Sequence, residues 1–469
     1  MKVKVIQSTW LGQEGRRLDC SPYLSGAIEA KVLLEKLSVE KHPLHQLTKG
    51  YKGGIYNGPQ FVRNYVNDSA YGVPFFTSGS IMYADLSYMR LLRKKDAESS
   101  KLNYLRLSPG MTLISSSGTI GRMTYARSDM DGLWSSQDVM KVVADPDKIL
   151  SGYLYAYLRT HYGVPLVTSG TYGAVIEHIE PLHIAKLPVP RLGNTFEEQV
   201  HQKVIEAAQL RTGYQIQVQQ ATQQLFAAVG LADITGSEWH SAESDLAFTT
   251  TIKSASSLRA VNFRPKFQNL CESIKAAPHK LLREICVPGT LKRGGRYKRV
   301  DAEPEYGCQL IGQKEIFWQQ PEGRWVAEFA LGKDVFVDPG TTLIAATGTL
   351  GESELYCRAE FIWGPMAEMA YSELFVRVVA NNAVMPKGCL YAFMRSETAF
   401  RMFRSISFGS KLQYLHPVFL PHLPVPYPDP HTQQAIHELV IDAYEKRHRS
   451  NVLENEAVAM VERAILEGV

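Results

Sequence analysis

Several short runs in this chain of 469 residues come close to catalytic or phosphate-binding patterns. An amino-methyltransferase holds its target base with an Asn/Asp-Pro-Pro-aromatic loop, but none of the three Asp-Pro steps (at Asp145, Asp338 and Asp429) continues with a second proline. Residues 289–294 have the glycine spacing of a phosphate-binding loop, but Gly295 stands where that loop needs lysine. Neither methyl transfer nor nucleotide hydrolysis is therefore predicted for this chain.

Nuclease and metal chemistry are equally poorly supported. A metal-dependent nuclease needs an acid followed by a Glu-x-Lys run on adjacent strands, whereas Glu29 and Lys31 follow Asp19 on a predicted helix. Histidines such as His42 and His178 have no metal-ligand spacing. The 6 cysteines are scattered without a Cys-x-x-Cys pair, which is typical of reduced thiols in a cytoplasm. The absence of a catalytic set favours a binding protein, with no metal or cofactor of its own.

Basic residues interleaved with tyrosine and glycine are the first binding candidates. Arginine and lysine can pair with phosphates or reach guanine O6 and N7. The net charge of +4 permits nucleic-acid binding without requiring it. A solvated basic loop is the alternative. The denser cluster comprises Lys292, Arg293, Arg296, Tyr297, Lys298 and Arg299, and the sparser one comprises Lys49, Lys52, Arg63, Asn64 and Tyr65.

Polar loops are the second set of candidates, since short hydroxyl side chains, glutamine and lysine can reach base edges. Ordinary turn chemistry is the alternative for all of them. The candidates are Thr77, Ser78, Ser80, Thr171, Tyr172, Gln313, Lys314, Ser410 and Lys411. The basic residues Arg90, Arg93, Lys94 and Lys95 are interpreted differently, as the solvated surface of an insertion confined to the first half of the chain.

An internal repeat organises these candidates. The run Pro109-Gly110-Met111-Thr112-Leu113-Ile114 returns as Pro339-Gly340-Thr341-Thr342-Leu343-Ile344, and over thirteen positions eight are identical. Residues 152–159 return at 388–395, and 187–190 at 423–426, so the offset stays between about 230 and 237. The chain therefore contains two copies of one segment of about 190 residues, and the two basic clusters fall at the same place in each copy.

Each copy is predicted to be an α+β segment followed by a long helix. Residues 27–37 and 152–159 read as helices, and 111–114, 139–143, 342–344 and 374–379 as strands. Residues 196–230 lack proline and carry a heptad seam: Val204, Ala207, Arg211, Tyr214, Val218, Ala221, Leu225 and Ala228. A weaker seam recurs at an offset of 236, interrupted by Ser450 and Glu454. Two such stripes favour pairing of the two helices, the alternative being that each packs on its own domain.

The length of the helices suggests a use for them. About 35 residues of helix span roughly 50 Å, and one turn of B-DNA is about 34 Å. Two similar domains held apart by a helical spacer could therefore contact one duplex at two places.

The order domain, long helix, domain, long helix resembles HsdS, the specificity subunit of type I restriction–modification enzymes. The matching residues are the Gly118-Thr119-Ile120-Gly121 turn, the Ser136-Gln137-Asp138 run before a strand, residues 152–159 and 187–190, and Glu198-Gln199 at the start of the helix. The resemblance covers nearly the whole chain. Departures lie in the second copy, where Ser372-Glu373-Leu374 replaces the Ser-Gln-Asp run and Gln434-Ala435 replaces Glu-Gln.

The resemblance implies an α+β fold with two similar target-recognition domains, separated and followed by long helices that pair as an antiparallel coiled coil with pseudo-two-fold symmetry. The expected boundaries are 1–192 for the first recognition domain, 193–232 for a spacer helix, 233–257 for a linker, 258–428 for the second recognition domain and 429–469 for the second spacer helix.

The resemblance also implies function and partners. Each domain would read one half of a bipartite target in double-stranded DNA, without chemistry of its own. The helices would dock two copies of a methyltransferase subunit that carries S-adenosylmethionine, and a translocating restriction subunit could join. No membrane partner is expected, because no apolar run is long enough to span a bilayer. Two alternatives stay open: a stand-alone DNA-modifying enzyme with an unrecognised site, and a nucleic-acid-binding adaptor in a phage-defence system.

Overall fold

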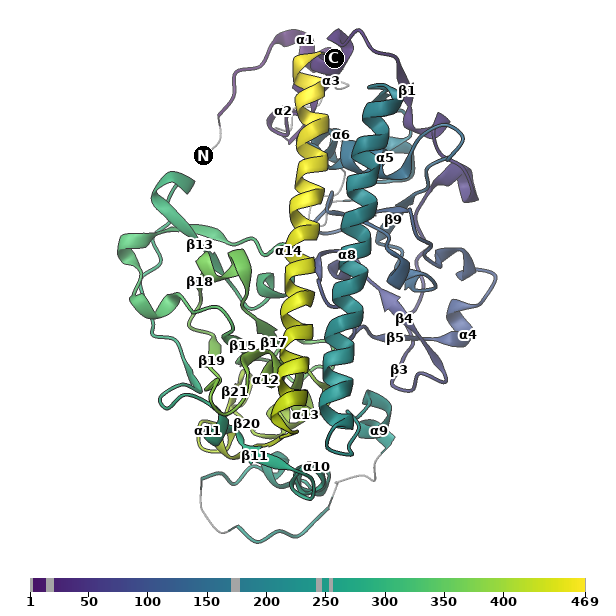
Figure 1. Ribbon diagram of the computed structural model, residues 1–469. Coiled ribbons are helices and arrows are strands. Elements are labelled where there is room, and N and C mark those ends of the chain that lie inside the picture. The colour runs from purple at the N-terminus through teal and green to yellow at the C-terminus, as the bar shows by residue number, and fades with distance from the viewer. Residues whose placement is uncertain (1–2, 14–20, 170–177, 242–246, 253–255, 469) are drawn as a thin grey trace. The chain divides into compact units, whose positions relative to one another are not determined.

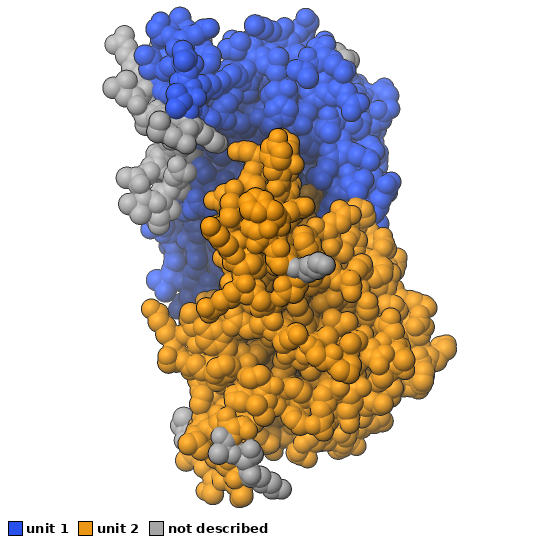
Figure 2. Space-filling view, turned by 90° about the vertical axis from the view of Figure 1, so that its left-hand side faces the viewer, with its two compact units in different colours: residues 1–83, 89–212, 449–469 blue, residues 84–88, 213–448 orange. Residues whose placement is uncertain are grey.

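The computed structural model describes residues 3–13, 21–169, 178–241, 247–252 and 256–468. Contacts divide the chain into two compact units, shown in different colours in Figure 2. Unit 1 comprises residues 1–83, 89–212 and 449–469, and unit 2 comprises residues 84–88 and 213–448. Both units therefore combine stretches that are far apart in the sequence. Among the described residues, no helix has the length and hydrophobicity needed to cross a bilayer.

Unit 1 is built from short sheets and short helices. The main sheet has the order β2 (Ile55–Tyr56), β9 (Val139–Val142), β6 (Thr112–Ser115), β7 (Met123–Tyr125), and its paired strands are antiparallel. A second sheet has the order β3 (Tyr65–Val66), β5 (Leu91–Arg93), β4 (Gly72–Phe76), β8 (Trp134–Ser135), and β1 (Lys41–Pro43) pairs with β10 (Pro188–Pro190). The helices are α1 (Ser8–Gln13), α2 (Ser21–Leu24), α3 (Ala27–Lys36), α4 (Lys94–Ala97), α5 (Ser151–Arg159), α6 (Gly163–Thr168) and α7 (Pro181–Ile184).

Three sheets of unit 2 correspond to the sheets of unit 1. Its main sheet has the order β12 (Lys292–Arg293), β19 (Phe375–Val378), β15 (Thr342–Ala345), β17 (Ala359–Phe361). The other sheets are β14 (Arg324–Ala327), β13 (Gly307–Ile311), β18 (Ala370–Tyr371); β11 (His279–Leu281) with β22 (Pro424–Pro426); and β16 (Thr347–Gly348), β21 (Gln413–Leu415), β20 (Ser407–Phe408). The helices are α9 (Gly236–Ser241), α10 (Pro265–Lys275), α11 (Leu282–Ile285), α12 (Lys387–Met394) and α13 (Glu397–Ser405).

The main sheets of the two copies have the same strand order and register. β6 pairs Leu113 with Lys141 of β9, and β15 pairs Leu343 with Arg377 of β19. The Pro-Gly step before each of these strands explains part of the repeat, because Gly110 and Gly340 have φ of 90° and 85°, where a side chain is disfavoured. The strands expected from the sequence at 111–114, 139–143, 342–344 and 374–379 are confirmed, as are the helices at 27–37 and 152–159.

The interpretation of Arg90, Arg93, Lys94 and Lys95 as an insertion confined to the first copy is wrong for Arg90 and Arg93. β5 pairs with β4 through Val73 and Leu92, and β14 pairs with β13 through Cys308 and Val326, so both copies contain this hairpin. The sequences of β5 and β14 share no pattern from which the match could be read. All four residues are exposed, as expected for a solvated surface, and Arg93 also forms an ion pair with Asp96 at 2.7 Å.

The two long helices are α8 (Asn194–Ala227) and α14 (Pro430–Glu467), coloured teal and yellow in Figure 1. Gly193 precedes α8 with a φ of 97°, and Glu197 accepts a hydrogen bond from the Leu192 amide. At the start of α14, Asp429 accepts from the amides of His431 and Thr432, which satisfies N–H groups that have no partner inside the helix. The long helix expected at 196–230 is confirmed, although it ends at Ala227, before Gly230 with its φ of 73°.

Helix α8 packs against helix α14 in both units, as expected from the paired seams. In unit 1 Lys203 forms an ion pair with Glu456 at 2.7 Å, and in unit 2 Gln217 donates to Asp442 at 2.5 Å. Seam residues such as Val204 and Val461 lie in the core of unit 1, and Val218 and Val440 in that of unit 2. The core of each unit therefore packs against one part of α8 and one part of α14.

Three details of the predicted seams are wrong. Ala228 is exposed and lies beyond the end of α8. Ser450 and Glu454 do not interrupt the second seam, because both are buried in it. Tyr155 donates to Glu454, which also forms ion pairs with Arg159 and Arg211. A heptad pattern scores a glutamate as a defect, and only the tertiary contacts show that arginines surround this one.

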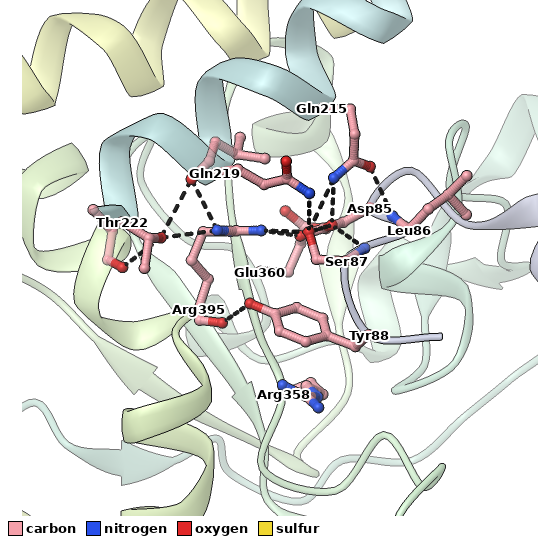
Figure 3. Close-up of polar contacts among 12 residues, drawn as sticks. Asp85, Leu86, Ser87, Tyr88, Gln215, Gln219, Thr222, Arg358, Glu360 and Arg395 are labelled. Carbon is pink, nitrogen blue, oxygen red and sulfur yellow. Dashed lines mark hydrogen bonds and ion pairs between the residues drawn. The ribbon is translucent and has the colours of Figure 1, made fainter. Parts of the chain in front are cut away.

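A five-residue segment of the first copy, residues 84–88, belongs to unit 2 (Figure 3). Asp85 forms an ion pair with Arg395 at 2.6 Å, and Gln215 accepts from the Leu86 amide at 2.7 Å. Tyr88 donates to the Arg395 carbonyl, and the Arg358 guanidinium lies 3.7 Å from the centre of the Tyr88 ring. These contacts embed the segment between α8 and the residues around Arg395.

Candidate nucleic-acid interface

The basic stretch of the first copy forms an exposed turn followed by a partly buried segment. Lys49 and Lys52 are exposed, and Lys52 has a φ of 46°. Lys49 contacts Asp145 at 3.0 Å and Asp147 at 3.4 Å, and the hydrogen bond with Asp145 raises the pKa of the lysine. The Lys52 ammonium lies 5.7 Å from the centre of the Tyr51 ring. The turn thus presents one lysine held by carboxylates and a second beside an exposed tyrosine.

Further along the same stretch, Arg63 is held from two sides. Its Nη2 donates to the Asp138 carboxylate at 2.7 Å, and its guanidinium lies 5.8 Å from the centre of the Phe75 ring. Asn64 donates to Asp96 at 3.0 Å, and Tyr65 on β3 packs under the Arg90 guanidinium at 4.7 Å. Carboxylates from other elements therefore hold Arg63 and Asn64, and the Arg90 guanidinium covers Tyr65.

The basic stretch of the second copy is organised around Glu373. Arg293 on β12 donates to the Glu373 carbonyl at 3.1 Å, and Arg299 donates to the Glu373 carboxylate at 2.7 Å. Burial opposes ionisation, but the bonds from its own backbone and from Arg299 lower the pKa of Glu373. Arg299 lies 6.0 Å from the centre of the Tyr297 ring. The other basic residues predicted here, Lys292, Arg296 and Lys298, are exposed.

Some of the predicted polar loops have structural contacts. Ser80 is buried, and its hydroxyl accepts from the Thr77 amide at 3.1 Å, so it holds the turn that carries Thr77 and Ser78. Gln313 exchanges hydrogen bonds with the backbone of Thr347, at 2.8 and 3.0 Å. These bonds fit ordinary turn chemistry for Ser80 and a connection between two loops for Gln313.

The structure brings several loops of the second copy together. Thr347 pairs with Tyr414 of β21, and the Arg293 guanidinium lies 5.4 Å from the centre of the Tyr414 ring. Gln413 donates to the Ser410 carbonyl, and Lys411 and Lys314 are exposed. Arg293, Gln313 and the loop of Ser410 and Lys411 thus share one region. In the first copy, the corresponding candidates Thr171 and Tyr172 lie outside the described residues.

Residues 136–138 and 372–374 hold these loops, and in the sequence only the resemblance draws attention to them. In the first copy the Ser116 amide donates to the Asp138 carbonyl at 2.9 Å, and in the second the Ala346 amide donates to the Leu374 carbonyl at 3.0 Å. The Ser136 amide donates to the Phe76 carbonyl, and the Ser372 amide to the Ile311 carbonyl. Residues 136–138 and 372–374 therefore connect the basic stretch, the loop after β4 or β13, and the loop after β6 or β15.

Sequence reasoning missed two further kinds of residue. Asp138 and Glu373 hold the arginines, yet acidic residues are not an obvious choice in a search for DNA contacts. Tyr71 and Tyr306, at equivalent places, leave 68% and 79% of their surface exposed. Their repetition in both copies was the available signal for the tyrosines, and their exposure became visible only in the structure.

The structure offers no support for metal chemistry among the residues it describes, where no group of three or more His, Cys, Asp or Glu side chains could hold an ion. Glu29 on α3 forms an ion pair with Lys4, and His42 contacts Glu40. The described cysteines Cys271, Cys286, Cys308, Cys357 and Cys389 are buried free thiols. Burial raises the pKa of Cys271 and Cys286 to about 12, which disfavours a reactive thiolate.

No protein-family model and no curated protein matches the chain. Among solved structures, it is similar to the S subunit of a type I restriction-modification system from M. genitalium, with a TM-score of 0.37 and 11% identity over 92% of this chain and 96% of that chain. The HsdS subunit from Thermoanaerobacter tengcongensis matches with a TM-score of 0.28 and 10% identity, over 92% and 97%. A chain from a study of complex assembly and conformational transition of the type I R-M system matches with 0.27 and 11%, over 92% and 98%.

Proposed function

We propose that this chain is the DNA sequence-specificity subunit of a type I-like restriction–modification complex, or of a related phage-defence complex, and that it performs no chemistry. The observation that carries the proposal is the duplicated arrangement of loops. Each copy joins a basic stretch to two neighbouring loops through the same short segment, residues 136–138 or 372–374. Two equivalent binding surfaces on one chain suit a DNA target that has two defined halves.

The two copies would be related by a pseudo-two-fold axis, with α8 and α14 forming an antiparallel coiled coil. Contacts inside each unit support this arrangement. Along α8, the residues Lys203, Arg211 and Gln217 contact Glu456, Asn451 and Asp442 of α14, so the partner number falls as the α8 number rises. The helix pair is the best candidate for a spacer. At 34 and 38 residues, α8 and α14 would be about 51 and 57 Å long, enough to span one turn of DNA of about 34 Å.

The partners follow from this role. A subunit without a catalytic set requires an enzyme to act on the DNA it selects, and we propose a methyltransferase that modifies adenine and carries S-adenosylmethionine. Two copies of it would suit a chain with two equivalent copies. A translocating restriction subunit would complete the complex. The cytoplasm, where the DNA of a bacterial cell lies, is the proposed location.

The experiment that tests this function determines the DNA sequence selected by the full-length chain. The chain and the subunits that co-purify with it are incubated with a library of randomised duplexes, and bound DNA is sequenced. The expected result is one motif with two defined halves and an unspecified gap of fixed length. A chain that cuts or modifies DNA without partners would support the stand-alone enzyme instead, and binding without sequence preference would support an adaptor.

A second experiment tests the spacer. Removing one heptad from α8 and the facing heptad from α14 shortens the helix pair by about 10 Å, which corresponds to about three base pairs. The gap in the motif should shrink by that amount while both halves stay the same. Replacing the same heptads by others of equal length is the control. A change in the identity of either half would show that the helices read the DNA.

A further inference from the structure

The two copies contain the same ion pair at equivalent positions. Arg63 and Arg299 are 236 residues apart, the offset that also relates β9 to β19. The Nη2 of Arg63 donates to Asp138 at 2.7 Å, and the Nη2 of Arg299 donates to Glu373 at 2.7 Å. The acids are not at identical alignment positions, because Asp138 and Glu373 are 235 residues apart. The geometry of the pair therefore recurs although the position and length of the acid differ.

Both pairs lie at a partly open surface. The side chains of Arg63 and Asp138 are 31% and 27% exposed, and those of Arg299 and Glu373 are 39% and 19% exposed. An aromatic ring lies near each guanidinium, Phe75 in the first copy and Tyr297 in the second. Surface ion pairs of this kind add little to stability, so stability gives no clear reason for both copies to contain one.

The acids are held firmly by their backbone. The Asp138 carbonyl accepts from Ser116, and its amide donates to the Ser136 hydroxyl at 3.2 Å. The Glu373 carbonyl accepts from Arg293 at 3.1 Å, and the strand that follows is paired on both sides. A carboxylate on such a rigid segment restricts the rotamers of the arginine that it binds. The arginine has five N–H donors, so donors remain for a second partner.

We propose that Asp138 and Glu373 are positioning residues that orient Arg63 and Arg299 toward base edges of duplex DNA, one arginine for each half of the target. This inference rests on the proposed function. A free surface arginine binds phosphates at any sequence, which adds affinity without selectivity. A carboxylate beside it repels phosphate and fixes the plane of the guanidinium. The fixed fork matches the O6 and N7 acceptors of guanine.

The test uses the full-length chain with its co-purifying subunits and the randomised duplex library. Asp138→Asn and Glu373→Gln keep the shape of each side chain and remove its charge. Asp138→Asn should reduce the preference at one base position in one half of the motif by roughly tenfold, and Glu373→Gln should do so in the other half. Binding to DNA without the motif should stay equal or become stronger, because a negative charge has been removed.

Controls separate this role from a structural one. Glu98→Gln in the first copy and Glu272→Gln in the second remove acids from other exposed ion pairs, and both should leave the motif unchanged. The variant that combines Asp138→Asn with Arg63→Ala should have the same motif as Arg63→Ala alone, since the acid acts through the arginine. If Asp138→Asn lowers the melting temperature, Arg63→Lys tests the same contact instead. Lysine keeps the positive charge but lacks the planar pair of N–H donors of the guanidinium.

The outcomes distinguish the two proposals. A wild-type complex that selects no motif contradicts the proposed function, and the positioning role with it. A wild-type motif that Asp138→Asn and Glu373→Gln leave unchanged contradicts the positioning role alone. Equal loss of affinity for all sequences also contradicts it, because that result would assign both arginines to phosphates.

Discussion

Units 1 and 2 hold arginines at matching positions of the repeat but neutralise them with acids from different places; Arg211, Arg395 and Arg447 are buried, and Arg159 is half-buried. Arg159 and Arg211 in unit 1 correspond, at an offset of 236, to Arg395 and Arg447 in unit 2. In unit 1 both contact Glu454 of α14. In unit 2 Arg395 contacts Asp85, and Arg447 contacts Glu360 of β17 at 3.3 Å.

The same offset shows which residue of each unit stands at the position of the other unit's acid. The position in unit 2 that matches Glu454 is Val218, whose carbonyl accepts from Arg395 at 2.8 Å but supplies no charge. The position in unit 1 that matches Glu360 is Thr124. A buried cation needs a compensating charge, so the missing acid near Arg395 is replaced by Asp85, from the segment of the first copy that belongs to unit 2. A repeated fold can therefore keep its cations while their counter-ions come from elsewhere in the chain.

The largest expected effect comes from Glu454→Ala. The variant leaves Arg159, Arg211 and Tyr155 without their shared acceptor, in a site where the glutamate side chain is 2% exposed. Removing one partner of a buried ion pair costs about 3–5 kcal/mol. Urea unfolding should show this loss, and hydrogen exchange should place it in unit 1. Glu456→Gln, at the exposed pair with Lys203, is the matched control and should leave the unfolding midpoint unchanged. An equal loss of unfolding free energy in both variants would show that burial does not determine how much an ion pair contributes to stability.

Asp85→Asn should have the next largest effect, in unit 2. It removes the charge that compensates Arg395, whose side chain is 3% exposed, but the amide can still accept a hydrogen bond. We expect a loss of about 2–3 kcal/mol, with faster hydrogen exchange around Arg395 and α13. Asp68→Asn, at an aspartate that caps the turn before β4, is the control in the same copy. Protection that decreases only in unit 1 would contradict the assignment of residues 84–88 to unit 2.

The Asp85 contact should also make stability depend on pH. Burial would raise the pKa of Asp85, but Arg395 and the hydrogen bonds from Ser87 lower it to about 2. Because this pKa is lower in the folded chain than in the unfolded one, the contribution to stability is complete above about pH 4 and is lost as the pH falls toward 2. The difference in unfolding free energy between wild type and Asp85→Asn should shrink by about 2 kcal/mol over that range. A constant difference would mean that Asp85 does not titrate in this way.

The smallest expected effect concerns a histidine hydrogen bond that occurs once in each unit. His201 Nδ1 accepts from the Gly152 amide, and His437 Nδ1 accepts from the Gly388 amide, each at 3.0 Å. Burial lowers the pKa of both histidines, so the neutral rings stabilise the fold above their usual pKa of about 6.5 and this stability is lost at lower pH. His201→Phe and His437→Phe should each lower the free energy of unfolding by roughly 1 kcal/mol at neutral pH. The two losses should be similar. Unequal costs in urea unfolding would show that the equivalence does not extend to energetics.

Much of the fold could be predicted from local pattern. The Pro-Gly steps at Gly110 and Gly340, the apolar strands after them and the proline-free stretch of α8 each reflect a short-range preference, so sequence reading found them. The hairpin formed by β4 and β5, and by β13 and β14 in the second copy, could not be predicted because its two versions share the strand pairing but not the residue pattern. The candidate arginines could be named from charge and glycine content, whereas their acids could not, since Asp138 lies 75 residues from Arg63.

The sequence by itself determined that the chain is a repeat, that each copy ends in a long helix, and that basic stretches fall at the same place in both copies. These features follow from periodicity and local identity. Only the tertiary structure decided which acid meets which arginine, that Glu454 belongs to the helix seam, and that residues 84–88 complete unit 2. The physical reason is that a buried charge selects its counter-ion by distance in space, and separation along the chain does not encode that distance.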